Sequence, residues 1–152
     1  MKLFELTTTV DWDWVNDKVA MFDTPKGKTY VVTFDTGEDK APPAKLMDIL
    51  QDYSPESIVE INFELRREED GSTQAVTGTG ESATVFAAVL QIIKEYINEN
   101  EVEAIYFAAT TQEPSRVKLY DTLARKLSNS GWEVQTRTKF VSPLKWYIAT
   151  AF

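Results

Sequence analysis

The sequence contains no cysteine and no histidine among its 152 residues. Without cysteine the chain has no disulfides, no thiolate metal ligands and no cysteine nucleophile. Without histidine it has no Ser-His-Asp triad, no imidazole zinc site and no imidazole acid or base near neutral pH. An enzyme built from this chain must therefore use carboxylates, tyrosine, lysine, serine, threonine or backbone groups.

The sequence also lacks an apolar run of the roughly 20 residues that a membrane-spanning helix needs. Its first residues do not show a basic segment followed by an apolar one, so no signal peptide is predicted. Basic residues are few, with 16 against 24 acidic ones and a formal net charge of −8. Because phosphate backbones repel an acidic surface, we expect no nucleic-acid partner, and the missing apolar run predicts no membrane partner.

Hydrophobic periodicity predicts a single domain over residues 1–152 in which strands outnumber helices. Alternating or continuously apolar runs bounded by turn residues predict strands at 2–8, 19–23, 28–35, 59–65, 73–77, 104–109, 132–140 and 145–151, with a polar bend at 11–14. Apolar residues at steps of three and four predict helices at 42–53, from Ser82 to about Ile97, and from Glu113 to about Asn129 or Gly131. We expect an α+β (mixed α/β) fold with a central, mostly antiparallel sheet and about three helices. One parallel step should lead from the 73–77 strand to the 104–109 strand.

The segment 76–127 is the most informative part of the chain. It reads as a Gly78-Thr79-Gly80 turn, an amphipathic helix, a buried strand and a second helix that begins at Glu113-Pro114. A glycine turn before a helix can hold a pyrophosphate, because exposed amides and the helix dipole both favour an anion. The same pattern also suits the packed centre of a fold that binds no cofactor.

This segment resembles the Gcn5-related N-acetyltransferase (GNAT) superfamily in its order of strands and helices. The resemblance implies that backbone amides at Gly78, Thr79 and Gly80 hold the pyrophosphate of acetyl-CoA. The chain departs from the family signature at Ala75, where Gln or Arg is usual, and Glu81 places a negative charge beside the turn. With this degraded signature we favour no cofactor, and acetyl-CoA is the cofactor if the chain is an enzyme.

The same resemblance suggests catalytic residues. Leu119-Tyr120 is similar to the family's Leu-Tyr pair, whose tyrosine protonates the departing thiolate. Tyr120 also lies on the apolar stripe of its helix, which equally suits a core tyrosine. Glu60 and Glu64 share the polar face of one strand, where a GNAT general base could sit, and a solvated sheet face is the alternative reading.

The chain is also similar to a group of small tailed-phage proteins. The shared segments are 77–80, 85–94 and 113–120, within a resemblance that covers 58–127. That resemblance implies a GNAT-like fold, a phage origin and a location in the host cytoplasm or the virion, but no established activity.

Two tryptophans, Trp12 and Trp14, stand at i and i+2 and would point the same way in an extended chain. They suit a protein-binding anchor, because tryptophan is enriched at interface hot spots, or packing over one end of the sheet. The sequence therefore favours a non-catalytic phage protein with a GNAT-like fold that acts through contacts with a phage or host protein. The alternative is a CoA-dependent N-acyltransferase.

Overall fold

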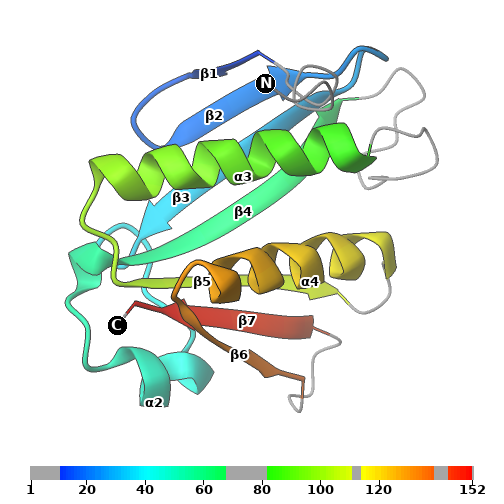
Figure 1. Cartoon of the computed structure of the whole chain (residues 1–152). Helices are drawn as coiled ribbons and strands as arrows, with labels where there is room; N and C mark the ends of the chain where they lie inside the picture. Colours follow the sequence, from blue (N-terminus) through cyan, green and yellow to red (C-terminus); the bar gives the residue numbers. More distant parts are fainter. Residues whose placement is uncertain (1–10, 68–81, 111–113, 139–143, 152) are drawn as a thin grey trace. The chain divides into compact units, whose positions relative to one another are not determined.

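The computed structural model describes residues 11–67, 82–110, 114–138 and 144–151 (Figure 1). Within these ranges the strands are β1 (Trp12–Trp14), β2 (Val19–Asp23), β3 (Thr29–Thr36), β4 (Ile58–Arg67), β5 (Ala104–Thr110), β6 (Glu133–Arg137) and β7 (Leu144–Thr150). The helices are the 3₁₀ turns η1 (Ala44–Leu46) and η2 (Pro55–Ser57) and the α-helices α2 (Met47–Leu50), α3 (Ser82–Glu99) and α4 (Pro114–Asn129).

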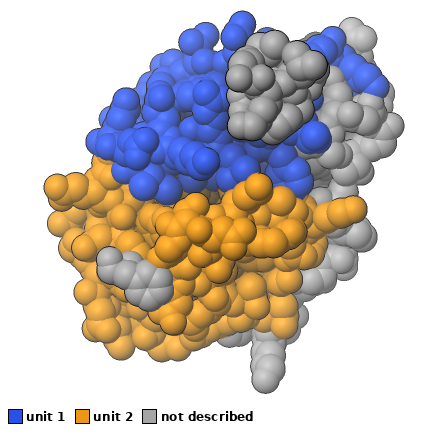
Figure 2. Space-filling view, in the orientation of Figure 1, with its two compact units in different colours: residues 1–33, 63–99 blue, residues 34–62, 100–152 orange. Residues whose placement is uncertain are grey.

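The strands follow the order β1-β2-β3-β4-β5-β7-β6 in one sheet of seven strands within the described ranges. The β4–β5 pair is parallel, and the β1–β2, β2–β3, β5–β7 and β6–β7 pairs are antiparallel. This confirms the predicted α+β class with a mostly antiparallel sheet and one parallel step. The chain divides into two compact units, residues 1–33 with 63–99 and residues 34–62 with 100–152 (Figure 2). The single domain over 1–152 stays a prediction.

In the first unit, a row of aromatic side chains crosses the strands. Phe22 stacks on Tyr30 with ring centroids 5.4 Å apart, and Tyr30 stacks on Phe63 at 5.3 Å. Phe22 and Tyr30 are direct cross-strand partners, so the stacking follows from the β2–β3 register. Helix α3 buries most of the apolar stripe that its sequence predicts, namely Val85, Val89, Ile92, Ile93 and Tyr96, together with Ala88. Phe86 and Ile97, which belong to the same predicted stripe, are half-buried.

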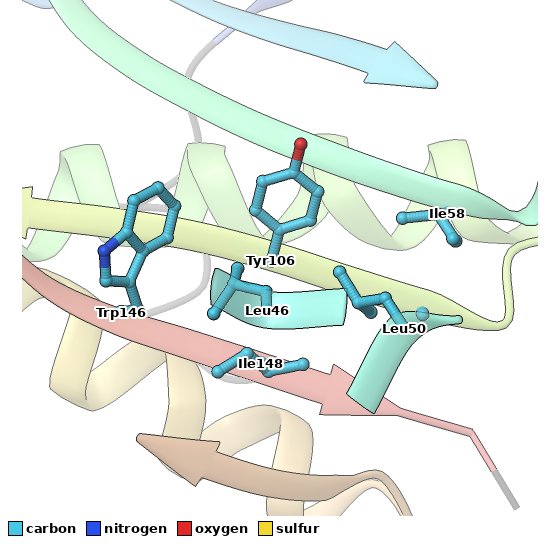
Figure 3. Close-up of a cluster of buried hydrophobic side chains, with 7 residues drawn as sticks. Leu46, Leu50, Ile58, Tyr106, Trp146 and Ile148 are labelled. Carbon is cyan, nitrogen blue, oxygen red and sulfur yellow. The ribbon is translucent and has the colours of Figure 1, made fainter. Parts of the chain in front are cut away.

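In the second unit, β5 is covered on both faces. Helix α4 packs on one face, where Phe107 meets Tyr120 and Tyr147 with ring centroids 5.0 Å away in each case. The short helices η1 and α2 pack on the other face, where Leu46 and Leu50 are fully buried (Figure 3). Their neighbours there are the buried residues Ile58, Ala104, Tyr106, Trp146 and Ile148. Burial on both faces explains why the β5 sequence is apolar without alternation.

An exposed ion pair ties β6 to α2. The two guanidinium nitrogens of Arg137 bind the two carboxylate oxygens of Asp48 at 2.8 and 2.6 Å. Arg137 also donates to the carbonyl oxygen of Lys45 at 3.1 Å. A bidentate pair of this kind fixes direction as well as distance, so it orients α2 against the β6 end of the unit.

Three details differ from the sequence predictions. Residues 11–14 were predicted as a bend, but Trp12–Trp14 is a strand, because the Asp-Trp alternation has the period of a strand paired with β2. The predicted helix 42–53 is a 3₁₀ turn followed by α2, which ends at Leu50, because Ser54 before Pro55 is held in extended geometry. The predicted 73–77 strand lies outside the described residues, and the parallel partner of β5 is β4.

The turn after β3 depends on a glycine. The amide of Gly37 donates to the carbonyl oxygens of Pro55 and Ile58, both at 2.9 Å. A Cβ atom on residue 37 would lie 2.8 Å from the Pro55 oxygen and 3.1 Å from its Cα, both of them backbone atoms that cannot rotate away. We expect Gly37→Ala to lower the free energy of unfolding by about 1–3 kcal/mol, measured by urea titration. The exposed neighbour substitution Glu38→Ala should change it by less than about 0.5 kcal/mol, and equal losses would contradict the close approach.

Candidate functional site

Glu60 is a nearly buried carboxylate on the face of β4 that carries Ile58. It is 8% exposed and is the direct cross-strand partner of Tyr106 in the parallel β4–β5 register. Its Oε1 atom lies 2.7 Å from Nζ of Lys40, whose side chain is 56% exposed. Among the described residues no group makes a well-directed hydrogen bond to this oxygen, so the contact acts as an ion pair. The contact with Glu60 raises the pKa of Lys40, so Lys40 is charged at neutral pH.

Tyr106 lies beside this carboxylate and is 1% exposed. Its ring packs against Trp146 with centroids 6.1 Å apart, and its hydroxyl points toward β4 (Figure 3). Burial raises the pKa of Tyr106, and the negative charges of Glu60 and Asp35 raise it further. The hydroxyl therefore keeps its proton at neutral pH and can donate a hydrogen bond to a ligand.

The parallel pairing of β4 with β5 covers only the first residues of each strand. In the part of the second unit that the structure describes, the pairs are Ile58 with Ala104, Val59 with Ile105 and Glu60 with Tyr106. Both strands continue beyond this point, and β5 stays paired with β7 on its other side as far as Thr110. The β4-facing edge of β5 after Tyr106 thus presents backbone amide and carbonyl groups, and such groups need a hydrogen-bonding partner when they are shielded from water.

Tyr120 lies on the opposite face of the sheet from Glu60. It is 2% exposed and makes edge-to-face contacts with Phe107 and Tyr147. Phe107 alternates with Tyr106 along β5, so their side chains point to opposite faces. The structure therefore does not bring Tyr120 and Glu60, the acid and base suggested by the sequence, together on one face.

A polar network accompanies Tyr120 on the α4 side. Oδ1 of Asp121 accepts hydrogen bonds from Nζ of Lys145 at 2.8 Å and from the Tyr147 hydroxyl at 2.6 Å. Burial alone would raise the pKa of Asp121, but these two hydrogen bonds outweigh it and hold the pKa below its usual value. Burial and the hydrogen bond to Asp121 raise the pKa of Tyr147. The network anchors α4 to β7 and leaves Asp121 ionised at neutral pH.

The remaining site residues predicted from sequence are dispersed. Glu64 is exposed on β4, and the turn Gly78, Thr79 and Gly80 lies outside the described residues. Trp12 and Trp14 are half-buried on β1, in the first unit.

Within the described ranges no three acidic side chains gather in an arrangement that could hold a metal ion. No helix there has both the length and the apolar character needed to cross a membrane.

Sequence reasoning missed Lys40 and Tyr106 as neighbours of Glu60. Tyr106 was recognised only as part of a buried strand, and nothing in its local sequence sets it beside a carboxylate 46 positions earlier. Glu60 is a polar residue in the otherwise apolar start of β4. That position could have indicated a polar neighbour such as Tyr106, because a buried carboxylate needs a partner.

No protein-family model matches the sequence, and no curated protein matches it significantly. Several solved structures are similar in fold. A crystal structure provisionally named a phosphinothricin N-acetyltransferase has 11% identity and a TM-score of 0.48, over 91% of this chain and 74% of that chain. The structure of AAC(6')-Ib with ribostamycin and coenzyme A has 12% identity and a TM-score of 0.49, over 88% of this chain and 65% of that one. Arabidopsis thaliana NAA60 in complex with acetyl-CoA has 8% identity and a TM-score of 0.46, over 89% of this chain and 76% of that one. None of these bears on a phage origin, and the fold described above rests on this chain's own strands and helices.

Proposed function

We propose that this chain binds an acyl-coenzyme A thioester and transfers its acyl group to an amine. The observation that carries the proposal is the end of the β4–β5 pairing at Glu60 and Tyr106. In the described part of the second unit, it leaves the β4-facing edge of β5 just after Tyr106 directly beside a nearly buried carboxylate and a protonated tyrosine hydroxyl. An acyl-pantetheine arm is an extended chain with two amides, which can hydrogen-bond to such an edge as an added strand does.

Glu60 is the residue that we assign as general base. An amine that attacks a thioester carbonyl must lose a proton, and a carboxylate within hydrogen-bond reach can accept it. The Glu60 carboxylate forms an ion pair with Lys40, and the largely exposed Lys40 side chain can swing into solvent when an amine takes its place. The bound thioester supplies the activated acyl group: its C–S bond breaks as the new C–N bond forms, and coenzyme A leaves as a thiolate that takes a proton from solvent.

Tyr106 is assigned a hydrogen-bonding role beside the base. Because its hydroxyl stays protonated, it can donate to an oxygen that gains negative charge during the reaction. Tyr120 takes no part in this assignment, since it packs among aromatic side chains on the other face. The complexes with coenzyme A and acetyl-CoA named above agree with the proposal, but it does not depend on them.

The proposal is tested by calorimetry with acetyl-CoA on the full chain. We expect measurable heat at micromolar to millimolar ligand and a loss of binding of at least about tenfold in Gly80→Asp, because a carboxylate there would oppose the pyrophosphate. Gln51→Asp adds the same charge at an exposed position in the second unit and should leave the affinity unchanged. Absence of heat at millimolar acetyl-CoA would contradict the proposal and favour the non-catalytic, protein-binding alternative. Equal losses in the two variants would show that general charge, rather than the turn, controls binding.

A further inference from the structure

Strand β6 forms one end of the sheet and has an outer edge. In the described part of the chain it pairs only with β7, on one of its two sides (Figure 1). The other backbone hydrogen bonds that join described residues do not involve Glu133–Arg137. Three of these five residues are exposed and two are half-buried. Another strand can therefore reach this outer side, which we call the β6 edge.

The direction of the backbone groups on the β6 edge follows from the neighbouring strands. The amide of Ala151 donates to the carbonyl oxygen of Glu103, one residue before β5, at 2.9 Å. Because backbone direction alternates along a strand, Thr150 directs its own groups the other way, toward its β6 partner Glu133. By the same alternation along β6, the backbone groups that point to the outer edge are those of Val134 and Thr136.

The sequence of β6 is complementary to itself when two copies run antiparallel. With Gln135 opposite the partner's Gln135, Val134 lies opposite the partner's Thr136, and Glu133 lies opposite the partner's Arg137. This register sets outward-pointing backbone groups against each other, so each Val134–Thr136 pair can exchange two hydrogen bonds. It also sets opposite charges directly across from each other at both ends of the pairing, and such pairs stabilise neighbouring strands.

Arg137 can bind a second carboxylate without releasing the first. Its bonds to Asp48 and to the carbonyl oxygen of Lys45 use three of the five N–H groups of the guanidinium. These bonds also hold the side chain in place, so less side-chain entropy is lost when the partner's Glu133 approaches. A peptide from another protein would need a matching order of charges, whereas a second copy of this chain provides that order by symmetry.

We propose that two copies of this chain associate through their β6 edges as an antiparallel dimer with twofold symmetry. A strand of this length spans only about 17 Å, so the pairing buries a small area and belongs to the class of weak, transient interfaces. The inference goes beyond acyl transfer and is independent of it, because it uses neither of the residues that we assign to that reaction.

Sedimentation equilibrium of the full chain, from about 10 μM to about 1 mM, tests the proposal. We expect a monomer–dimer equilibrium with a dissociation constant of about 10–500 μM. Glu133→Lys sets like charges opposite each other at both ends of the pairing and should weaken the dimer at least about tenfold. Thr136→Pro removes an outward backbone donor but no bond to β7, and should weaken it by a similar factor. The matched control, Glu56→Lys, makes the same charge change at an exposed residue of η2 and should weaken the dimer no more than about threefold.

A mixture of two variants tests the antiparallel register. Arg137→Glu alone should also weaken the dimer, because carboxylates then lie opposite each other. Mixed with Glu133→Lys in equal amounts, it should form a heterodimer of nearly the original affinity, since residues 133 and 137 again carry opposite charges at both ends.

Three results would overturn the proposal: a chain that stays monomeric at about 1 mM, equal affinities in Glu133→Lys and Glu56→Lys, or a mixture of folded variants that forms no heterodimer. Circular dichroism checks that each variant is folded. If Arg137→Glu loses its fold together with the Asp48 pair, the comparison of Glu133→Lys with Glu56→Lys still decides between the outcomes.

Discussion

Replacing Glu60 with glutamine should lower kcat for acyl transfer by about 10²- to 10⁴-fold while leaving the affinity for acetyl-CoA unchanged. Glutamine keeps the size of the side chain and its place beside Tyr106, but it cannot accept the proton that the attacking amine loses. Lys40 loses its partner in this variant, and because its side chain is 56% exposed, water can solvate it. The measurement is steady-state kinetics with acetyl-CoA and a panel of primary amines, with acetyl-CoA affinity measured by calorimetry.

Glu64→Gln provides the comparison on the same strand. Glu64 lies four residues further along β4 and is exposed, so it lacks the burial of Glu60. We expect its kcat to change by less than about threefold. A large loss of kcat in Glu64→Gln, with little loss in Glu60→Gln, would show that Glu64 rather than Glu60 is the general base. Reduced acetyl-CoA affinity in Glu60→Gln would indicate a binding role instead of proton transfer.

Replacing Leu50 with alanine should lower the free energy of unfolding by about 2–5 kcal/mol, measured by urea titration. Leu50 is fully buried, and it belongs to a four-residue helix with no side-chain N-cap. A helix this short has little stability of its own, so its position depends on packing against the sheet. Loss of the leucine leaves a cavity beneath α2 and also removes the packing that holds the helix over β5 and β7.

The neighbouring substitution Gln51→Ala is the control for Leu50→Ala. Gln51 is exposed and directly follows α2, so its truncation should change the free energy of unfolding by less than about 0.5 kcal/mol. A loss below about 1 kcal/mol in Leu50→Ala would contradict the view that α2 is held by its buried leucines.

Local pattern was enough to predict most elements of the fold. The alternation around Ile61 predicted β4, and the stripe that includes Val89 predicted α3, because each pattern repeats with the period of one type of structure. The exceptions depend on how the strands pair. Residues 12–14 form a strand because their alternation lets them pair with β2 across a short turn. The parallel partner of β5 is a long-range choice, since β4 lies far earlier in the chain and no local window of sequence contains both strands.

The candidate site could be predicted only in part for the same reason. Glu60 was identified from sequence as a possible base because it lies on the polar side of an alternating strand. Its neighbours Lys40 and Tyr106 come from a turn and from another strand, and the β4–β5 register that aligns Tyr106 with it is a long-range property. Tyr120 carried the stronger motif, yet the packing of α4 places it among aromatic rings on the other face.

The position of β5 has a consequence for synthesis of the chain. Its two neighbours in the sheet come from opposite directions in the sequence, since β4 precedes it and β7 is the last strand described. When β5 leaves the ribosome, its neighbour β4 has already been synthesised. The longer pairing of β5, which joins seven of its residues to β7, cannot be completed until residue 150 has also left the ribosome. For that interval the most apolar strand of the sheet has an open edge, which is when a nascent chain is most exposed to aggregation and most dependent on chaperones.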